Sequence, residues 1–306
     1  RTPKVITDDE GRAIVIFVGG PTRDPTRDHA WNDVARRAAT TMASVRKEGV
    51  AADVLPKDAQ SHRRGEFVAL PVGVSHGNGR LVCALTLSMK LVERLLEDQD
   101  IQRITSYQSS VFSYYAPKLY AQYCHNLVRV FAHDEALQRN FKDSIFPAAS
   151  FNLGPATVSI DHTDAGNVGY GLCALASLGS FDSRRGGHLI LFDMGLFVEF
   201  PPGTIALLPS GILRHGNTPI QDGEERYSIA QYCAGGLLRW VKYGCQTVVS
   251  IRQSFSKAKA EEVIGSLNGV HEDRVQEALQ LFSKVDELAS DRRETYKDFA
   301  TFLKAD

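Results

Sequence analysis

The sequence has no excess of charge of either sign, few cysteines and no long apolar run. Its 306 residues carry 35 Lys and Arg against 36 Asp and Glu, a formal net charge of -1. No global basic field therefore indicates a nucleic-acid partner, although net charge does not exclude a local basic face. The five cysteines contain no C-x-x-C pair, which argues against a disulfide framework or zinc knuckle and favours a reducing compartment. Without a run of about 18 apolar residues, we expect no membrane span.

The first half of the chain mixes helical patterns with glycine-rich loops. Residues 13–18 (AIVIFV) are predicted to form a buried strand, closed by a Gly-Gly-Pro turn. Residues 29–48 have apolar side chains at helical spacing, and we interpret the arginines and lysines among them as a solvated helix face. Helices are also predicted for residues 81–100 and 114–140, and a short strand for residues 67–70.

Two basic loops flank the short strand at residues 67–70. They carry Arg63, Arg64 and Arg80, together with the glycine-rich segment 75–79 (SHGNG). Such loops could wrap a phosphate backbone or could be plain surface loops. This region by itself favours neither interpretation.

After residue 146 the chain changes to short β-branched or aromatic segments separated by Gly, Pro, Asn and Asp. Strands are predicted at residues 157–162, 172–178, 188–192, 196–200, 204–209 and 226–233. We therefore predict an α+β fold with a double-stranded β-helix (jelly-roll) core over residues 146–250. An N-terminal region of helices and loops, residues 1–145, and a C-terminal helical extension, residues 251–306, flank the core. We expect that extension to pack on the outside and to contribute no chemistry.

An H-x-D triplet, His162 and Asp164, ends the first of these predicted strands. Residues two apart in a strand face the same side, so one imidazole and one carboxylate can address one ion. A third ligand has to come from a distant strand, and His215 is the available candidate. Two histidines and one carboxylate on one face, with other positions open, are typical of non-haem Fe(II) oxygenases that bind a 2-oxo acid and O2.

A co-substrate of this kind carries a distal carboxylate, which needs a charged and preferably bidentate partner when it is buried. Arg226 begins the last predicted strand of the core, and Ser228 lies two residues on, on the same face. We predict that this guanidinium and this hydroxyl hold the carboxylate. His188 opens another core strand and could also reach the iron site. Each residue alone is a weak signal, and their order and strand context together carry the prediction.

Residues 146–244 resemble the TET/JBP family of Fe(II)/2-oxoglutarate dioxygenases, and most of all its fungal members found near mobile elements. The resemblance implies that His162, Asp164 and His215 bind iron, and that Arg226 and Ser228 grip 2-oxoglutarate. With O2, these are the expected cofactors and co-substrates.

The same resemblance implies further roles for single residues. His188 matches a histidine that contacts the other end of the co-substrate. Asn167 matches a side chain that hydrogen-bonds a flipped base, and Tyr232 matches the aromatic ring on which that base stacks. Ala234 departs from the pattern, because members that oxidise 5-methylcytosine have a base-contacting histidine there. N6-methyladenine is therefore an alternative substrate to 5-methylcytosine.

The function implied by the resemblance is a nuclear enzyme that acts on methylated double-stranded DNA. It would flip the target base out of the duplex and oxidise its methyl group to hydroxymethyl and further oxidised or demethylated products. The predicted contacts to the DNA backbone are Arg63, Arg64, Arg80, Arg184 and Arg185. We expect the chain to act as a monomer and to have no membrane partner.

Other functions also fit the sequence. An oxygenase of the same mechanism that acts on a protein or a small molecule would account for the near-neutral charge. A catalytically inactive β-helix module that binds DNA is a second alternative, and the complete ligand set argues against it. A cupin-like metal protein without oxygenase activity is disfavoured by Arg226 and Ser228.

Overall fold

The computed structural model describes residues 2–21, 31–57, 61–62, 64–75 and 86–302. Its centre is a seven-stranded antiparallel sheet in the order β1-β2-β10-β7-β12-β6-β5, beside a three-stranded sheet in the order β11-β8-β9. The strands of the large sheet are β1 (Lys4–Thr7), β2 (Ala13–Val18), β5 (Val68–Gly73), β6 (Ala148–Leu153), β7 (Cys173–Ser180), β10 (Ile205–Leu208) and β12 (Glu225–Tyr232). The small sheet consists of β8 (Leu189–Leu191), β9 (Leu196–Val198) and β11 (His215–Asn217), while β3 (Ser61–His62) pairs with β4 (Gly65–Glu66).

Strand β2 shows why the large sheet is buried on both faces. Its side chains alternate between two apolar cores, as the two-residue period of a strand requires. Val15 and Phe17 pack with Leu189 and Leu191 of the small sheet, whereas Ile16 packs into the core under the helices. The two sheets and their helical cover form the predicted double-stranded β-helix within an α+β fold.

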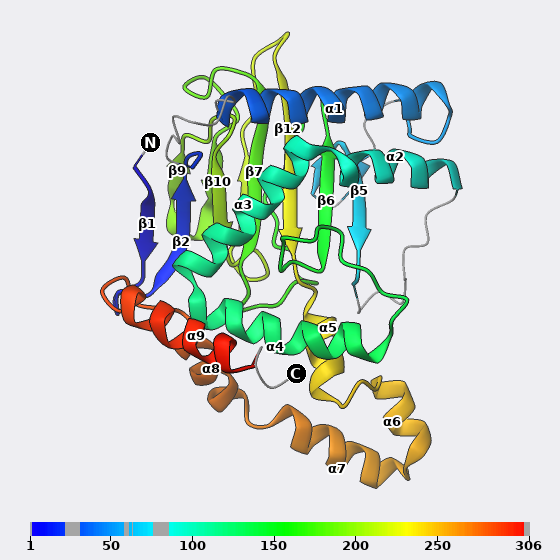
Figure 1. Cartoon of the computed structure of the whole chain (residues 1–306), viewed down its shortest axis with the longest axis vertical. Coiled ribbons are helices and arrows are strands. Elements are labelled where there is room, and N and C mark those ends of the chain that lie inside the picture. The colour runs from blue at the N-terminus through cyan, green and yellow to red at the C-terminus, as the bar shows by residue number, and fades with distance from the viewer. Residues whose placement is uncertain (1, 22–30, 58–60, 63, 76–85, 303–306) are drawn as a thin grey trace.

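Helices cover the outer face of the large sheet and one of its ends (Figure 1). They are α1 (Trp31–Ala51), α2 (Thr86–Glu97), α3 (Gln99–Tyr115), α4 (Pro117–His133), α5 (Gly235–Lys242), α6 (Val248–Ser254), α7 (Lys257–Asn268), α8 (His271–Gln280) and α9 (Leu288–Phe302), with a short 3-10 turn at Phe192–Met194. Helices α1 and α3 pack on the sheet. Helices α4 to α9 gather below it, as Figure 1 is oriented.

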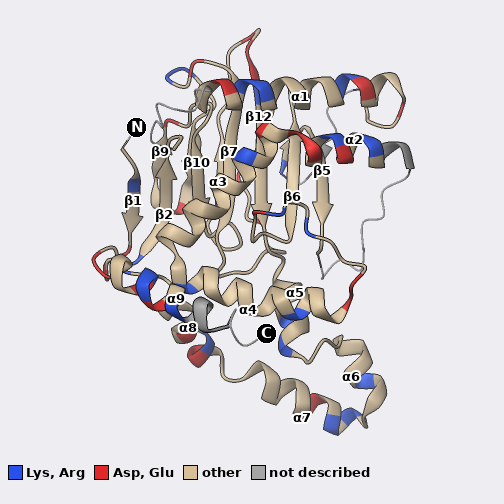
Figure 2. Cartoon of the chain, in the orientation of Figure 1, with Lys and Arg blue, Asp and Glu red and all other residues tan. Residues whose placement is uncertain are grey.

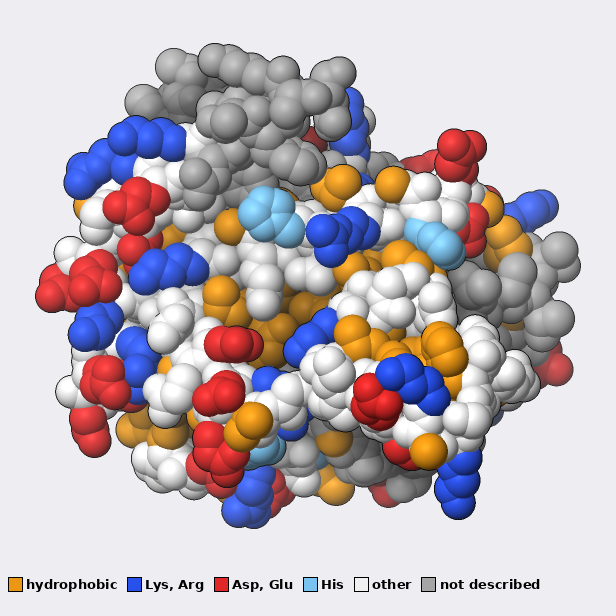
Figure 3. Space-filling view, turned by 90° about the horizontal axis from the view of Figure 1, so that it is seen from below, with side chains coloured by type: hydrophobic (Ala, Val, Ile, Leu, Met, Phe, Trp, Pro, Cys, Tyr) orange, Lys and Arg blue, Asp and Glu red, His pale blue; other side chains and the backbone are white. Residues whose placement is uncertain are grey.

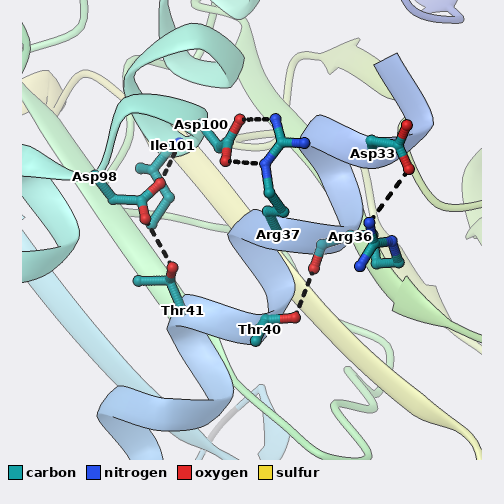
Figure 4. A network of polar contacts seen from close by, with 8 residues as sticks. All are labelled: Asp33, Arg36, Arg37, Thr40, Thr41, Asp98, Asp100 and Ile101. Atoms are coloured by element: carbon teal, nitrogen blue, oxygen red, sulfur yellow. Dashed lines mark hydrogen bonds and ion pairs between the residues drawn. The ribbon is translucent and has the colours of Figure 1, made fainter. Parts of the chain in front are cut away.

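Polar side chains join α1 to α3 (Figure 4). The Arg37 guanidinium donates to both carboxylate oxygens of Asp100, at 2.7 and 2.6 Å. Thr41 donates to Asp98 at 2.7 Å, and the other oxygen of Asp98 caps α3 by accepting from the Ile101 backbone N–H at 2.9 Å. Arg37 is therefore not part of the solvated face predicted for this helix. Its contact with Asp100 joins α1 to α3, and both helices pack on the sheet.

Several element boundaries differ from those expected. The predicted helix over residues 114–140 is divided, because α3 ends at Tyr115 and Pro117 begins α4; proline suits a first helical turn, where its missing N–H is not needed. Residues 157–162 form no continuous strand and join their neighbours through isolated bridges at Ser159 and His162. The segment before residue 146 supplies β1, β2 and β5 to the core sheet.

Four of the five cysteines lie among the described residues. Cys124, Cys173, Cys233 and Cys245 are free thiols, and Cys83 lies outside the described residues. No helix in the described part of the chain has the length and apolar character needed to cross a bilayer.

Candidate metal centre and active-site cleft

The three predicted ligands converge on one point between the sheets. His162 and His215 face each other across an antiparallel bridge, with ring centroids 4.3 Å apart. Asp164 reaches both rings, with carboxylate oxygens 3.8 Å from His162 Nε2 and 3.9 Å from His215 Nε2. The ligand atoms of all three lie within 4.8 Å of one another, and no other such group of His, Cys, Asp and Glu occurs among the residues described.

Both imidazoles are oriented by backbone carbonyls. His162 Nδ1 lies 2.7 Å from the Ile160 carbonyl oxygen, and His215 Nδ1 lies 2.9 Å from that of Leu213. A carbonyl oxygen only accepts, so Nδ1 of each ring must carry the hydrogen. The Nε2 lone pairs are then left for an ion, the tautomer that histidine metal ligands commonly adopt.

The environment of His162 favours the neutral form of its ring. Burial lowers the pKa of His162, and the neighbouring His215 lowers it further. A neutral imidazole is the form that binds a metal. Two histidines and one carboxylate are a donor set that could hold Fe(II).

The loop that contains Ser210 supports both Asp164 and Asn167. The Ser210 carbonyl accepts from the Asp164 N–H at 2.7 Å, and the Ser210 hydroxyl accepts from the Asn167 side-chain amide at 3.0 Å. Asn167 N–H donates in turn to the Asp164 carbonyl at 2.8 Å. The sequence did not single out Ser210, because its link to these residues spans more than forty positions and has no local signal.

Arg226 is a buried cation without a carboxylate partner among the described residues. It is 2% exposed, and burial lowers its pKa to about 10. Its Nη1 donates to the Thr157 carbonyl at 3.0 Å, while its Nε and the Thr157 hydroxyl are buried with no hydrogen-bond partner. A buried charge with an unsatisfied donor is costly unless an anion joins it. The sequence missed Thr157, whose orphaned hydroxyl belongs to the same polar pocket.

The anion site and the metal site lie along one wall. Asn217 donates to the Thr157 carbonyl at 3.3 Å and stands two residues from His215 on β11. Ser228, buried on the same face of β12 as Arg226, accepts from Asn152 at 2.8 Å. Its hydroxyl hydrogen is therefore available to a ligand. A carboxylate such as that of 2-oxoglutarate fits these groups.

Asp164 also lines a cleft with a volume of about 1420 Å³. Asn167, Tyr232 and Ala234 line it, and burial raises the pKa of the Tyr232 phenol. Tyr232 stands on the same face of β12 as Arg226 and Ser228, since these residues are an even number apart. The predicted metal ligand and both predicted base-contacting residues therefore share one opening.

The remaining predicted site residues do not all lie at the cleft or the triad. Arg64 lines the cleft, while Arg63 and Arg80 lie outside the described residues. The His188 ring centroid lies 4.5 Å from that of Phe197, with the rings tilted by 35°, and its Nδ1 lies 3.1 Å from the Thr218 hydroxyl. No contact of His188 with the triad occurs among the interactions of the described residues.

Arg184 and Arg185 follow β7 at the end of the sheet where Arg226 pairs with Gly179. The cleft opens at the other end of β12, at Tyr232, so the two arginines do not line it. Arg184 is bound through two hydrogen bonds of 2.9 Å to Asp182, which lower the pKa of that carboxyl to about 2. Arg185 donates to Gln221 at 3.2 Å. Their predicted role at a DNA backbone stays a prediction.

Comparison with known proteins gives distant structural likenesses. No protein-family model and no curated protein matches the chain. Among solved structures, NgTET1 in complex with 5mC DNA is similar over 77% of this chain and 78% of its own, with TM-score 0.49 and 14% identity. An oxidoreductase of the 2OG-Fe(II) oxygenase family from Burkholderia pseudomallei is similar over 67% and 91%, with TM-score 0.34 and 16% identity. A viral collagen prolyl hydroxylase of Paramecium Bursaria Chlorella virus-1 is similar over 28% and 57%, with TM-score 0.23 and 14% identity.

Proposed function

We propose that this chain is an Fe(II)/2-oxoglutarate-dependent dioxygenase that oxidises the methyl group of a methylated DNA base. The observation that carries the oxygenase part is the pairing of the His162–Asp164–His215 triad with the buried and unsatisfied guanidinium of Arg226. The triad supplies three ligands on one side of an ion and leaves the other side open. Arg226 supplies the charge that a dicarboxylic co-substrate needs at its far end.

The chain's own residues have separable tasks in this reaction. The bound iron, with 2-oxoglutarate and O2, supplies the oxidising power that converts the methyl C–H into C–OH, with succinate and CO2 as co-products. Arg226 and Ser228 hold the far carboxylate and so fix which end of the co-substrate meets the metal. The protein's further contribution is to position the methyl group and to exclude water.

The DNA part of the proposal rests on the resemblance and on the cleft beside Asp164. A base inside a duplex cannot reach a buried ion, so it has to be flipped out at a cost of a few kcal/mol. Tyr232 and Asn167 line the cleft at its metal end and offer stacking and an amide hydrogen bond to a flipped base. Because Ala234 offers no polar contact, N6-methyladenine and 5-methylcytosine are both candidate substrates. We propose that the protein acts in the nucleus, as a monomer.

The experiment combines metal content, co-substrate turnover and product analysis. Protein loaded with Fe(II) and given 2-oxoglutarate should release succinate, with stimulation by duplexes that contain 5-methylcytosine or N6-methyladenine. Mass spectrometry of the nucleosides should find a hydroxymethyl or demethylated product. The variant Asp164→Ala should lose bound iron and both activities, and normal turnover by this variant would show that the iron assignment is wrong.

Two outcomes separate the alternatives. Succinate release that methylated DNA does not stimulate favours an oxygenase that acts on a protein or a small molecule. A protein that binds DNA but neither iron nor 2-oxoglutarate is the inactive module. Arg226 disfavours the inactive module, since a buried guanidinium without a carboxylate partner among the described residues is a cost to folding that a bound anion would offset.

A further inference from the structure

The cleft beside the metal centre extends well beyond what one flipped base needs. Its volume of about 1420 Å³ exceeds the roughly 300–1,000 Å³ of sites that enclose drug-sized molecules. From Asp164 it runs between α4, α5 and α8, three helices from distant parts of the chain. The C-terminal extension, expected to pack only on the outside, therefore forms one wall of the opening that leads to the triad.

Four cations on these helices line the cleft: Arg129 on α4, Arg239 and Lys242 on α5, and Arg274 on α8. All four residues are exposed. Their side chains make no hydrogen bond or ion pair with any other residue in the described ranges. Besides the triad's Asp164, the acidic residue lining the cleft is Glu277, so the wall is electropositive before a ligand arrives.

Two cations of the neighbouring helices α6 and α7 are paired. Arg252 donates to Glu261 at 3.0 Å, and Lys259 to Glu262 at 2.7 Å. Figure 2 shows Lys and Arg on α5, at the end of the sheet, and mixed charges on α7. The four cleft cations gather instead on the lining of one cleft, where a ligand can supply the negative charge.

The spacing of these cations suits an extended anion better than a compact one. Arg239 and Lys242 are three residues apart, so they stand on one helix face with Cβ atoms about 5–6 Å apart. Arg129 and Arg274 come from two other helices, which spreads the positive charge along the cleft. Figure 3 views this end of the molecule and shows Lys and Arg side chains beside a hollow with hydrophobic side chains in it.

Neutral groups of the cleft also suit a nucleotide chain. Gln122 lines the cleft and has a buried side-chain oxygen without a hydrogen-bond partner among the described residues, an acceptor that an amino or imino N–H of a base could satisfy. Gly236 also lines it, in the first turn of α5, and adds no side chain to the wall. The cations can therefore contact phosphates, while the amide oxygen is suited to a base edge.

We infer that the α4–α5–α8 cleft binds the phosphodiester backbone of the nucleic-acid strand whose base enters at Asp164, through Arg129, Arg239, Lys242 and Arg274. That the strand leads a base toward the metal rests on the proposed function. That the cleft binds a polyanion rests on the four unpaired cations that line it. The C-terminal helices are then part of the substrate site. Arg184 and Arg185, at the other end of the sheet, are not required for this contact.

The test measures binding separately from chemistry. A fluorescein-labelled duplex with one methylated base is titrated with protein at several salt concentrations, and anisotropy reports the affinity. Lys242→Glu and Arg274→Glu should each weaken binding by about tenfold or more. Each should also make the negative slope of log K against log salt shallower by about 0.9. Lys257→Glu, an exposed lysine of α7 that does not line the cleft, is the matched charge reversal and should bind like the unaltered protein.

Lys242→Gln and Arg274→Gln, with unchanged unfolding temperatures, exclude misfolding as the cause of weaker binding. Unchanged affinity and salt slope in the cleft variants would overturn the inference. So would failure of the unaltered protein to bind the duplex, or displacement of the duplex by poly-glutamate as readily as by unlabelled duplex.

Product analysis separates this inference from the proposed function. If Lys242 and Arg274 are needed for binding but no methyl group is oxidised, the cleft assignment stands and the proposed reaction fails. If methylated DNA is oxidised and Lys242→Glu keeps the KM of the unaltered protein, the reaction stands and the cleft assignment fails.

Discussion

His162 and His215 exchange both of their backbone hydrogen bonds. The His162 N–H donates to the His215 carbonyl at 3.1 Å, and the His215 N–H donates to the His162 carbonyl at 2.9 Å. Residues opposed in this way have a fixed separation. The spacing of the two imidazoles is therefore set by main-chain pairing rather than by the side chains alone.

The first prediction tests this backbone control through Gly216, the neighbour of His215. A Cβ at Gly216 would lie 2.7 Å from the Ser159 carbonyl oxygen and 3.0 Å from that of Ile160. Gly216→Ala should push residues 159–160 away from β11 and lower Fe(II) affinity by about tenfold or more, although every ligand remains. Metal content after dialysis against graded chelator measures the effect. Gly265→Ala on α7, where no atom lies within 4 Å, should bind iron normally.

Replacing Arg226 should raise the stability of the ligand-free protein but weaken its binding of 2-oxoglutarate. Because it is buried without a carboxylate partner among the described residues, Arg226→Met should raise the ligand-free stability by about 1–3 kcal/mol. The same variant should lose the stabilisation that 2-oxoglutarate gives the unaltered protein. Urea unfolding with and without 2-oxoglutarate measures both effects. A variant that is less stable without ligand yet still stabilised by 2-oxoglutarate would contradict the anion site.

At alkaline pH, the stability of the unaltered protein and that of Arg226→Met should depend differently on pH. The pKa of Arg226 is lowered by burial from 12.5 to about 10, so between these values the unfolded chain binds the proton more tightly than the folded chain. Stability then rises with pH through that window, relative to a protein without the group. The difference by which Arg226→Met is more stable than the unaltered protein should therefore shrink as pH increases above about 10. Urea unfolding midpoints from pH 8 to 11 measure this difference. A constant difference over this range would argue that the guanidinium is already paired.

Ser210 should act as a positioning residue for the substrate and not for the metal. Ser210→Ala removes the hydroxyl that accepts from Asn167 but keeps the carbonyl that accepts from Asp164. We expect unchanged iron content and an increase in KM for methylated DNA of several-fold to about tenfold, since one hydrogen bond contributes about 1 kcal/mol. Ser210→Thr, which keeps a hydroxyl, should recover part of the loss. Iron loss in Ser210→Ala would place its role at the metal instead.

A buried amide network should stabilise the strand that carries the site. The Gln231 amide donates to the Thr105 carbonyl and to Gln108, both at 2.9 Å, and its oxygen accepts from Ser144 at 2.7 Å. Gln231→Leu should lower the free energy of unfolding by about 3 kcal/mol, because several buried polar groups lose their partner. Gln253→Leu at an exposed position of α6 should change it by less than about 0.5 kcal/mol. Equal effects of the two changes in urea unfolding would contradict this role.

Local patterns of the sequence were enough to predict the jelly-roll strands and the residue types of the site. Five of the six strands predicted after residue 146 correspond to β7, β8, β9, β10 and β12, because alternating apolar residues and turn residues are local signals. The H-x-D triplet and the R-x-S pair could be identified because strand geometry places residues two apart on one face. The triad in the structure has the same three members.

Long-range packing decided the rest. Residues 157–162 did not form a strand of their own, since isolated bridges and single backbone hydrogen bonds rather than a continuous ladder join them to other segments. Strand β6 was not expected because its burial on both faces gives no alternation. The unsatisfied Nε of Arg226 and the loop contact of Ser210 depend on segments far apart in the chain. So does the convergence of Arg129, Lys242 and Arg274 on one cleft. The sequence by itself determined which chemistry the side chains can perform. Tertiary structure determined which of them share a site, because spacing along a chain says nothing about distance across a fold.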